Sequence, residues 1–147
     1  MRNKIIIQEN NFDIAKKQIQ SAKAPRIFSS NNDELNRKIL EKLPINLLLI
    51  NQSNRKGSQK QENSGFNQVL AKIAKKNNVA IGINFDEIIN AKPKRKAEIL
   101  ARIKQNIKLC NKNKIKMKFI SQKPRDIYDL KALGLVLGMP TWMTKQL

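Results

Sequence analysis

Residues 46–50 read NLLLI, and four consecutive apolar residues after one asparagine indicate a buried strand. A strand with one face in water alternates apolar and polar residues, whereas a strand covered on both faces is apolar throughout. Strands of the second kind belong to parallel sheets and barrels, in which helices cover the outer face. The stretch therefore predicts an α/β fold.

The chain on either side of this strand repeats one pattern, a short apolar run followed by an amphipathic helix. The other predicted strands cover residues 4–8, 26–28, 79–83 and 116–120. The predicted helices cover residues 12–22, 33–43, 66–74 with Ser64 as cap, 93–112 and 124–138, with a short turn capped by Asp86. Five such units are too few for an eight-stranded barrel, so we expect a partial or distorted TIM-like (β/α) barrel, with an open sheet as the alternative.

The charge of the chain is strongly unbalanced. Thirty Lys and Arg residues face eleven Asp and Glu residues, which gives a net charge of +19. Such a charge repels itself unless anions screen it, and nucleic acid is the usual anionic partner. Aromatic residues make up only 5% of the chain, so we expect contacts with the phosphates and shape of folded RNA more than base stacking.

Other locations and chemistries have weaker support in the sequence. No apolar run approaches the ~20 residues that span a bilayer, and the apolar run near the N-terminus is too short for a signal peptide. We therefore expect a cytoplasmic protein without membrane contact. The chain has no histidine and a single cysteine, Cys110, which excludes the usual zinc sites and the usual nucleophilic triads.

The carboxyl ends of the predicted strands are the usual ligand-binding edge of such a fold. They carry Gln8, Glu9, Ser29, Ser30, Asn51, Gln52, Asn84, Ser121 and Gln122. These amides and hydroxyls, with a single carboxylate, form a poor cage for a metal ion. Asp86, the nearest other acid, is interpreted as a helix cap. We therefore expect no catalytic residue and no metal site in the protein.

Clusters of basic residues are the candidate RNA contacts. They are Arg55, Lys56 and Lys60 in a polar loop, Lys75 and Lys76 at a helix end, Lys94, Arg95 and Lys96 at the start of the long helix, Lys116 and Lys118 in the fifth strand, and Lys123 and Arg125 before the last helix. For any one of these residues, a solvated surface position is the alternative. Trp142 is open to two interpretations, a partner anchor or a packing residue.

Residues 64–85, SGFNQVLAKIAKKNNVAIGINF, also resemble a known family. We interpret the apolar residues Phe66, Val69, Leu70 and Ile73 as a scaffold face. The three lysines of the stretch, at positions 72, 75 and 76, are expected to face outward. Together with NDELNRKILEK at 32–42, NLLLI, RKAEILARIKQNIKLCNKNKIKMKFIS at 95–121 and PRDIYDLKALGLVLGM at 124–139, the stretch is similar to ribonuclease P protein component 3. That family is a protein subunit of archaeal and eukaryotic ribonuclease P.

The resemblance implies a single domain over residues 1–147, with a shortened version of a barrel related to metal-dependent phosphoesterases. It implies a non-catalytic subunit of the endoribonuclease P holoenzyme that binds ribonuclease P RNA, pairs with a second protein subunit and supports 5′-end maturation of precursor tRNA. The RNA and Mg²⁺ would carry the chemistry, and the protein would bind no cofactor. Arg102 and Asn106 match recurring family positions and are expected to orient the barrel end or face a partner. Gln68 and Asn46 stand where the family commonly has histidine and aspartate.

Two other functions remain open from the sequence. One is a metal-dependent phosphoesterase with its own site, and the other is a general RNA-binding or ribosome-associated protein. The first would need a bound metal ion and activity without RNA, and the second would recover ribosomal RNA after crosslinking.

Overall fold

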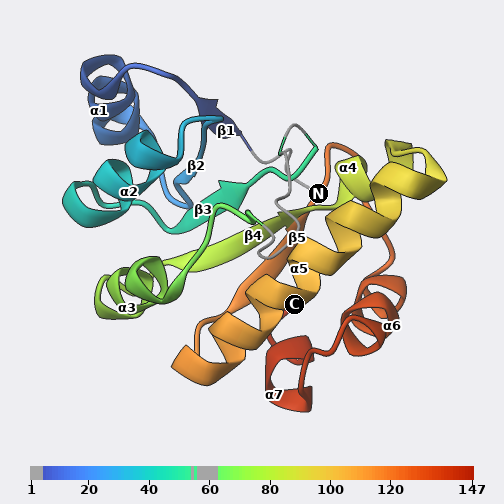
Figure 1. Cartoon of the computed structure of the whole chain (residues 1–147). Coiled ribbons are helices and arrows are strands. Elements are labelled where there is room, and N and C mark those ends of the chain that lie inside the picture. The colour runs from blue at the N-terminus through green and yellow to red at the C-terminus, as the bar shows by residue number, and fades with distance from the viewer. Residues whose placement is uncertain (1–4, 54, 56–62) are drawn as a thin grey trace.

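A computed structural model describes residues 5–53, 55 and 63–147 of the chain. It contains one five-stranded sheet in which every neighbouring pair is parallel and the strands follow in chain order. The strands are β1 (Ile6–Gln8), β2 (Ile27–Ser29), β3 (Leu47–Ile50), β4 (Ala80–Asn84) and β5 (Met117–Ile120). Figure 1 shows this unbroken order. A sheet that never reverses its strand order is wound as a barrel is, and differs in this from doubly wound sheets.

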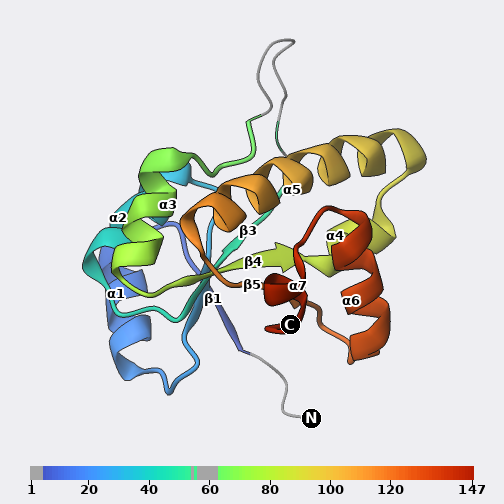
Figure 2. The same cartoon turned by 90° about the horizontal axis from the view of Figure 1, so that it is seen from below.

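Helices connect the strands and cover one face of the sheet (Figures 1 and 2). They are α1 (Phe12–Ser21), α2 (Asp33–Lys42), α3 (Gln68–Lys76), α4 (Phe85–Asn90), α5 (Pro93–Asn113), α6 (Ile127–Val136) and α7 (Thr141–Thr144). Alternate strand residues point into the helix layer, among them Ile7, Phe28, Leu48, Ile81 and Met117. None of the described helices combines the length and apolar character needed to cross a bilayer.

The opposite face of the sheet has its own buried cluster. Ile27, Leu47, Leu49 and Ile120 pack together there and are each at most 6% exposed. Gly82 lies beneath them, and a Cβ atom at Gly82 would lie 2.6 Å from Leu47 Cδ2. Side chains of β3 therefore lie across β4, as the inward-facing layer of a barrel does. One cavity is lined both by Ile6 of β1 and by Ile120 of β5, so the two edge strands face one another.

These contacts confirm the partial barrel and exclude a flat open sheet. Within the described residues, β1 and β5 each have a strand on one side only. Barrel closure would require further strands between them. The sheet is therefore a curved segment of a barrel with two unpaired edges.

The predicted elements are present, and their ends differ by a few residues, in part because other residues cap the helices. Asn67, and not Ser64, caps α3, since its side chain accepts the amide hydrogen of Leu70 at 2.9 Å. Asn84, and not Asp86, caps α4. The last predicted helix corresponds to α6, which ends before Gly138, whose φ of 101° lies in the left-handed region. Helix α7 lies beyond it, in residues for which no helix was predicted.

One predicted core position of α3 is exposed, and Trp142, which had two possible interpretations, is half-buried. Val69 is 50% exposed, so the scaffold face of α3 consists of Leu70, Ala71 and Ala74 with its neighbour Phe66. The indole Nε1 of Trp142 donates to Asn111 Oδ1 at 2.9 Å, and the Lys114 ammonium lies 5.4 Å from the ring centroid. The structure thus gives Trp142 a packing role against the end of α5.

The amides at the two positions where the resemblance leads one to expect histidine and aspartate both form hydrogen bonds. Gln68 and Asn113 exchange two amide hydrogen bonds of 3.2 Å each, which join α3 to α5. Asn46 Oδ1 accepts the backbone amide of Arg26 at 2.7 Å and joins the starts of β2 and β3. Both amides therefore fix neighbouring elements.

Cys110 lies on the buried face of α5 and is completely covered. Burial raises the pKa of its thiol from 9.0 to about 12. The thiol therefore remains protonated in the folded protein, and its position is that of a small core residue.

Candidate functional site

Polar side chains from three neighbouring strands meet at the carboxyl edge of the sheet. Asn84 at the end of β4 donates to Asn51 Oδ1 at 2.9 Å, and Asn51 donates to Ser29 Oγ at 3.0 Å. This chain of hydrogen bonds crosses the ends of β2, β3 and β4. The prediction that amides and hydroxyls gather at this edge is therefore confirmed.

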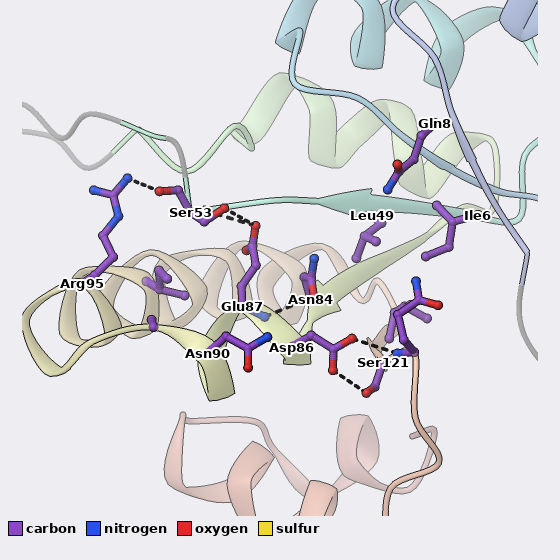
Figure 3. Close-up of a pocket in the computed structure, with 14 residues that line it drawn as sticks. Ile6, Gln8, Leu49, Ser53, Asn84, Asp86, Glu87, Asn90, Arg95 and Ser121 are labelled. Atoms are coloured by element: carbon purple, nitrogen blue, oxygen red, sulfur yellow. Dashed lines mark hydrogen bonds between the residues drawn. The ribbon is translucent and has the colours of Figure 1, made fainter.

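Two cavities open at this edge. The larger, of about 430 Å³, is shown in Figure 3. Its polar lining includes Gln8, Asn84, Asp86, Glu87, Arg95 and Ser121, and its apolar lining includes Ile6, Leu49 and Ile120. The smaller, of about 320 Å³, is lined by the polar loops that follow β1, β2 and β3. A group bound in the larger cavity would meet charged and apolar side chains as well as amides, whereas the smaller cavity offers mainly amides and hydroxyls.

Glu87 fixes the loop that follows β3. Its Oε2 accepts the amide of Gln52 at 2.8 Å, and its Oε1 accepts both the amide and the hydroxyl of Ser53, at 3.2 and 2.8 Å. A carboxylate that accepts three hydrogen bonds from one loop holds that loop firmly. The sequence did not predict this role, because Ser53 and Gln52 precede Glu87 by 34 and 35 residues.

Asp86 fixes the loop that follows β5. It accepts the Ser121 hydroxyl at 2.6 Å, the Gln122 amide at 2.8 Å and Arg125 Nη2 at 3.3 Å. Its interpretation as a helix cap is therefore wrong, since Asn84 does the capping. Burial by itself raises the pKa of Asp86, but the hydrogen bonds from Ser121, Gln122 and Arg125 outweigh it and hold the pKa below 3.8.

Replacement of Asp86 by asparagine tests this clamp. We expect Asp86→Asn to lower the free energy of unfolding at pH 7 by about 1–2 kcal/mol, because charge-assisted hydrogen bonds are lost. The folded pKa is depressed, so the stabilisation is present above the unfolded pKa and is lost as pH falls through the folded value. The difference between the two proteins should therefore begin to shrink below about pH 4 and continue to fall at lower pH, in urea denaturation measured across pH. A difference that persists unchanged at pH 2 would contradict the charge assignment.

The carboxylates at this edge do not fit a metal ion. A metal-dependent phosphoesterase of this fold would need several carboxylate or histidine ligands that converge on one point. The oxygens of Asp86 and Glu87 already accept hydrogen bonds from two different loops. Among residues 5–53, 55 and 63–147, no three His, Cys, Asp or Glu side chains form a group that could hold a metal ion.

Arg102 supports the same loop from within the protein. It is 1% exposed, and its guanidinium donates to the carbonyl oxygens of Gln52 at 3.3 Å and Arg55 at 3.0 Å. Asn106, one turn further along α5, is 3% exposed. Both residues lie inside the protein, so they match the interpretation in which they orient the barrel end and not the one in which they face a partner.

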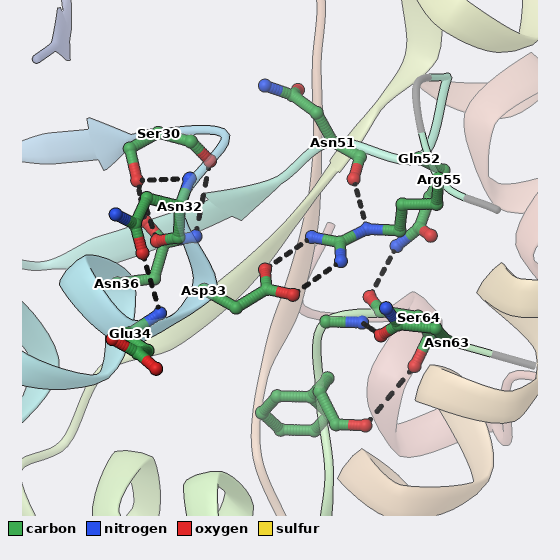
Figure 4. Close-up of polar contacts among 12 residues, drawn as sticks. Ser30, Asn32, Asp33, Glu34, Asn36, Asn51, Gln52, Arg55, Asn63 and Ser64 are labelled. Carbon is green, nitrogen blue, oxygen red and sulfur yellow. Dashed lines mark hydrogen bonds and ion pairs between the residues drawn. The ribbon is translucent and has the colours of Figure 1, made fainter. Parts of the chain in front are cut away.

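Arg55 is held by contacts within the chain, as Figure 4 shows. Its Nη1 and Nη2 donate to the two Asp33 carboxylate oxygens at 2.8 Å each, and its Nε donates to the Asn51 carbonyl at 2.7 Å. Its side chain is 10% exposed. Little of its guanidinium faces solvent and its charge is paired within the chain, so contact of Arg55 with RNA stays a prediction.

Two other arginines of the predicted set also hold loops. Arg95 donates to the Ser53 carbonyl and pairs with Glu98 at 3.1 Å. Arg125 donates to Ser121 Oγ at 3.1 Å and lies over the Phe85 ring at 5.0 Å. Both remain partly exposed, so an RNA contact would add to an existing structural role.

The predicted lysines stay at the surface and form two separate groups. Lys94 and Lys123 are exposed and Lys96 is half-buried at the carboxyl edge. Lys75, Lys76 and Lys116 are exposed at the opposite edge, where a cavity of about 210 Å³ is lined by Lys75, Lys114 and Lys116. Lys118 is half-buried, and its ammonium donates to the Gln146 carbonyl. Lys56 and Lys60 lie outside the described residues.

Comparison with known families places this geometry in context. The family described as RNase P subunit p30 matches residues 8–144. Ribonuclease P protein component 3 of Methanococcus maripaludis strain C7 is 26% identical over 139 residues, which cover 95% of this chain and 57% of that protein. The same component of Methanococcus vannielii is 30% identical over 122 residues, which cover 82% and 50%. The chain thus spans about half the length of these curated relatives.

A solved structure has the same fold. A chain in the cryo-EM structure of archaeal ribonuclease P with mature tRNA matches with a TM-score of 0.75 and 21% sequence identity. The match covers 95% of this chain and 62% of that chain. At this level of identity the likeness concerns the fold, and it agrees with the curved parallel sheet described above.

Proposed function

This chain belongs to the RNase P subunit p30 family, and from this premise we propose that it acts as a protein subunit of ribonuclease P. In that role it binds the catalytic RNA and supports 5′-end maturation of precursor tRNA. The observation that carries the proposal is the family match over residues 8–144, nearly the whole chain. The net charge of +19 and the exposed lysines at both edges of the sheet are the features expected of an RNA-bound subunit.

The physical contribution of the protein would be electrostatic. Folding of a large RNA brings phosphates close together, and each Lys contact with a phosphate releases a condensed counterion. Lys94 and Lys123 at one edge, and Lys75, Lys76 and Lys116 at the other, are the exposed members of the predicted set. Their charges would favour the compact, active form of the RNA. The protein would therefore lower the Mg²⁺ concentration that cleavage requires.

The chemistry of cleavage is assigned to the RNA together with Mg²⁺. The donor set of the described residues supports this division, because the Asp86 and Glu87 oxygens are occupied by loop contacts. A second protein subunit is the other proposed partner. The unpaired edges of β1 and β5 support a protein partner, since exposed strand edges are usually covered in native assemblies.

Reconstitution tests the function. The protein and its partner subunit are added to ribonuclease P RNA and precursor tRNA at a Mg²⁺ concentration at which the RNA alone is nearly inactive. We expect 5′-end cleavage to rise by about tenfold or more, because removal of phosphate repulsion by cationic contacts is worth several kcal/mol. The control replaces the protein by polylysine of equal total charge.

Each competing function predicts a different result, in the reconstitution or in a separate measurement. Equal cleavage with and without the protein would contradict the proposal. Selective recovery of ribosomal RNA after crosslinking in cells would favour a general RNA-binding protein. Hydrolysis of bis(p-nitrophenyl) phosphate by the purified protein, without any RNA, would favour a phosphoesterase with its own site.

A further inference from the structure

Helix α5 has two sharply different faces. Its buried face carries Ile99, Arg102, Ile103, Asn106, Ile107 and Cys110. Besides Pro93 at its first position, its exposed residues are Lys94, Ala97, Ala101, Lys104, Lys108 and Lys112, each three or four positions after the one before. That spacing puts all six on one side of the helix, over a length of about 27 Å. Figure 2 shows α5 lengthwise on the outer side of the sheet. We call these six residues the α5 lysine stripe.

The α5 lysine stripe has no acidic member. The only acid in α5 is Glu98, which is half-buried and pairs with Arg95 at 3.1 Å. None of the ion pairs among the described residues includes Lys104, Lys108 or Lys112. Like charges four residues apart on a helix repel one another and weaken it. The helix therefore carries a repulsion that an external anion would relieve.

The helix dipole accounts for only part of this pattern. Lys112 lies in the last turn, where a cation interacts favourably with the partial negative charge of the helix end. Lys104 and Lys108 lie in the middle of the helix, where that effect has faded. Folding of this chain gives no reason for their charge. Solvation alone accommodates exposed lysines, but a line of cations without partners of opposite sign on the same face is also a surface that a polyanion would bind.

We propose that the α5 lysine stripe binds the phosphate backbone of an RNA. This inference rests on the proposed function and names a surface for it. Lysines four positions apart have Cβ atoms ~6 Å apart, a spacing that lets successive ammonium groups reach successive phosphates. Ala97 and Ala101 keep the surface low between Lys94 and Lys104, so the backbone of a folded RNA can approach the helix closely.

A phosphate backbone fits this surface better than a protein does. The centre of a protein interface is usually apolar or aromatic and is depleted of lysine. The α5 lysine stripe contains lysine and alanine alone. Lysine is a mobile point charge that suits phosphate contacts without base readout. The sequence signal was present in the spacing of Lys104, Lys108 and Lys112, although the predicted contacts included none of these three residues.

Two matched variants test the stripe. The first is K104Q/K108Q/K112Q, and the second is K16Q/K17Q/K23Q, which removes three exposed lysines from α1 and the turn after it. The probe is ribonuclease P RNA, and the dissociation constant is measured over a range of salt concentrations. We expect the first variant to reduce the slope of log affinity against log salt by about 2–3, which is a loss on the order of 100-fold at 0.15 M salt. The second variant should stay near the wild-type slope.

The outcomes separate the two proposals. Equal slopes for the two variants would overturn the stripe while the proposed function stands. If the wild-type protein binds a random RNA duplex as tightly as ribonuclease P RNA, the proposed function fails, and the same pair of variants on that duplex still decides the stripe. Unchanged RNA affinity together with loss of the second protein subunit would assign the stripe to an acidic protein. Should the triple variant unfold, the single variant K108Q is expected to change the slope by about 1.

Discussion

Replacement of Arg102 by alanine is expected to lower the free energy of unfolding by about 3–5 kcal/mol. Arg102 is among the largest fully buried side chains of the protein. It donates charge-assisted hydrogen bonds to the carbonyl oxygens of Gln52 and Arg55. Truncation would leave both carbonyls with one bond fewer and would open a cavity under the loop. The two losses add, because hydrogen bonding and packing fail together at the same position.

Urea denaturation measures this effect, and two further variants separate its causes. Arg102→Met keeps most of the volume and removes the donors, so it should retain the packing part of the stability and lose the hydrogen-bonding part. Lys104→Ala lies on the exposed side of the same helix and should change stability by less than about 0.5 kcal/mol. A loss below about 1 kcal/mol for Arg102→Ala would show that the loop does not depend on the guanidinium.

Replacement of Leu49 by alanine is expected to cost about 3 kcal/mol or more of unfolding free energy. Leu49 is 1% exposed and belongs to the cluster on the inner face of the sheet, with Ile27, Leu47 and Ile120. The sheet can bury this cluster only because it curves and lets side chains of β3 lie over Gly82. The cost of the substitution therefore reports how completely the inner face of the sheet is buried.

Leu135 provides the matched control, since the chemical change is identical and the residue is 57% exposed. Leu135→Ala should stay within about 0.5 kcal/mol of the wild-type protein. Both variants are measured by urea denaturation. The slope of unfolding free energy against urea concentration should equal that of the wild-type protein, so that all three proteins are compared with the same unfolded state. If Leu49→Ala cost as little as Leu135→Ala, the inner face would be open to water and the barrel description would be wrong.

The fold was largely readable from the sequence because each strand is short, apolar and followed by a helix. The run at 46–50 predicted a buried parallel strand, and β3 is buried at all four positions. The helix starts were less readable, because Asn67 and Ser64 are both good caps and only the path of the chain chooses between them. The curvature depends on Gly82, Leu47 and Leu49 meeting across strands, which a linear pattern does not reveal.

The sequence predicted where the candidate site lies and which residue types it contains, but not which side chains form hydrogen bonds or ion pairs with one another. The carboxyl edge carries the predicted amides and hydroxyls because that edge is fixed by topology. The side-chain partners of Asp86 and Arg55 lie 22 to 39 residues away and depend on how loops fold over one another. Arginine and lysine residues of the predicted set also have different surroundings in the structure, which the net charge of the chain does not reveal. Arg55, Arg95 and Arg125 bind loops with their planar guanidinium groups, whereas Lys94 and Lys123 remain in solvent.

The covered thiol of Cys110 has a consequence for how the protein can be followed in time. A thiol-reactive reagent needs the thiolate, and a thiol with a pKa of about 12 in the core supplies almost none. Modification must then wait until α5 separates from the sheet and the group regains an ordinary pKa. Since the chain has one cysteine, the labelling rate reports that single opening event without any engineered probe. Because the thiol is buried, the protein should also remain free of intermolecular disulfides when it is purified without reductant.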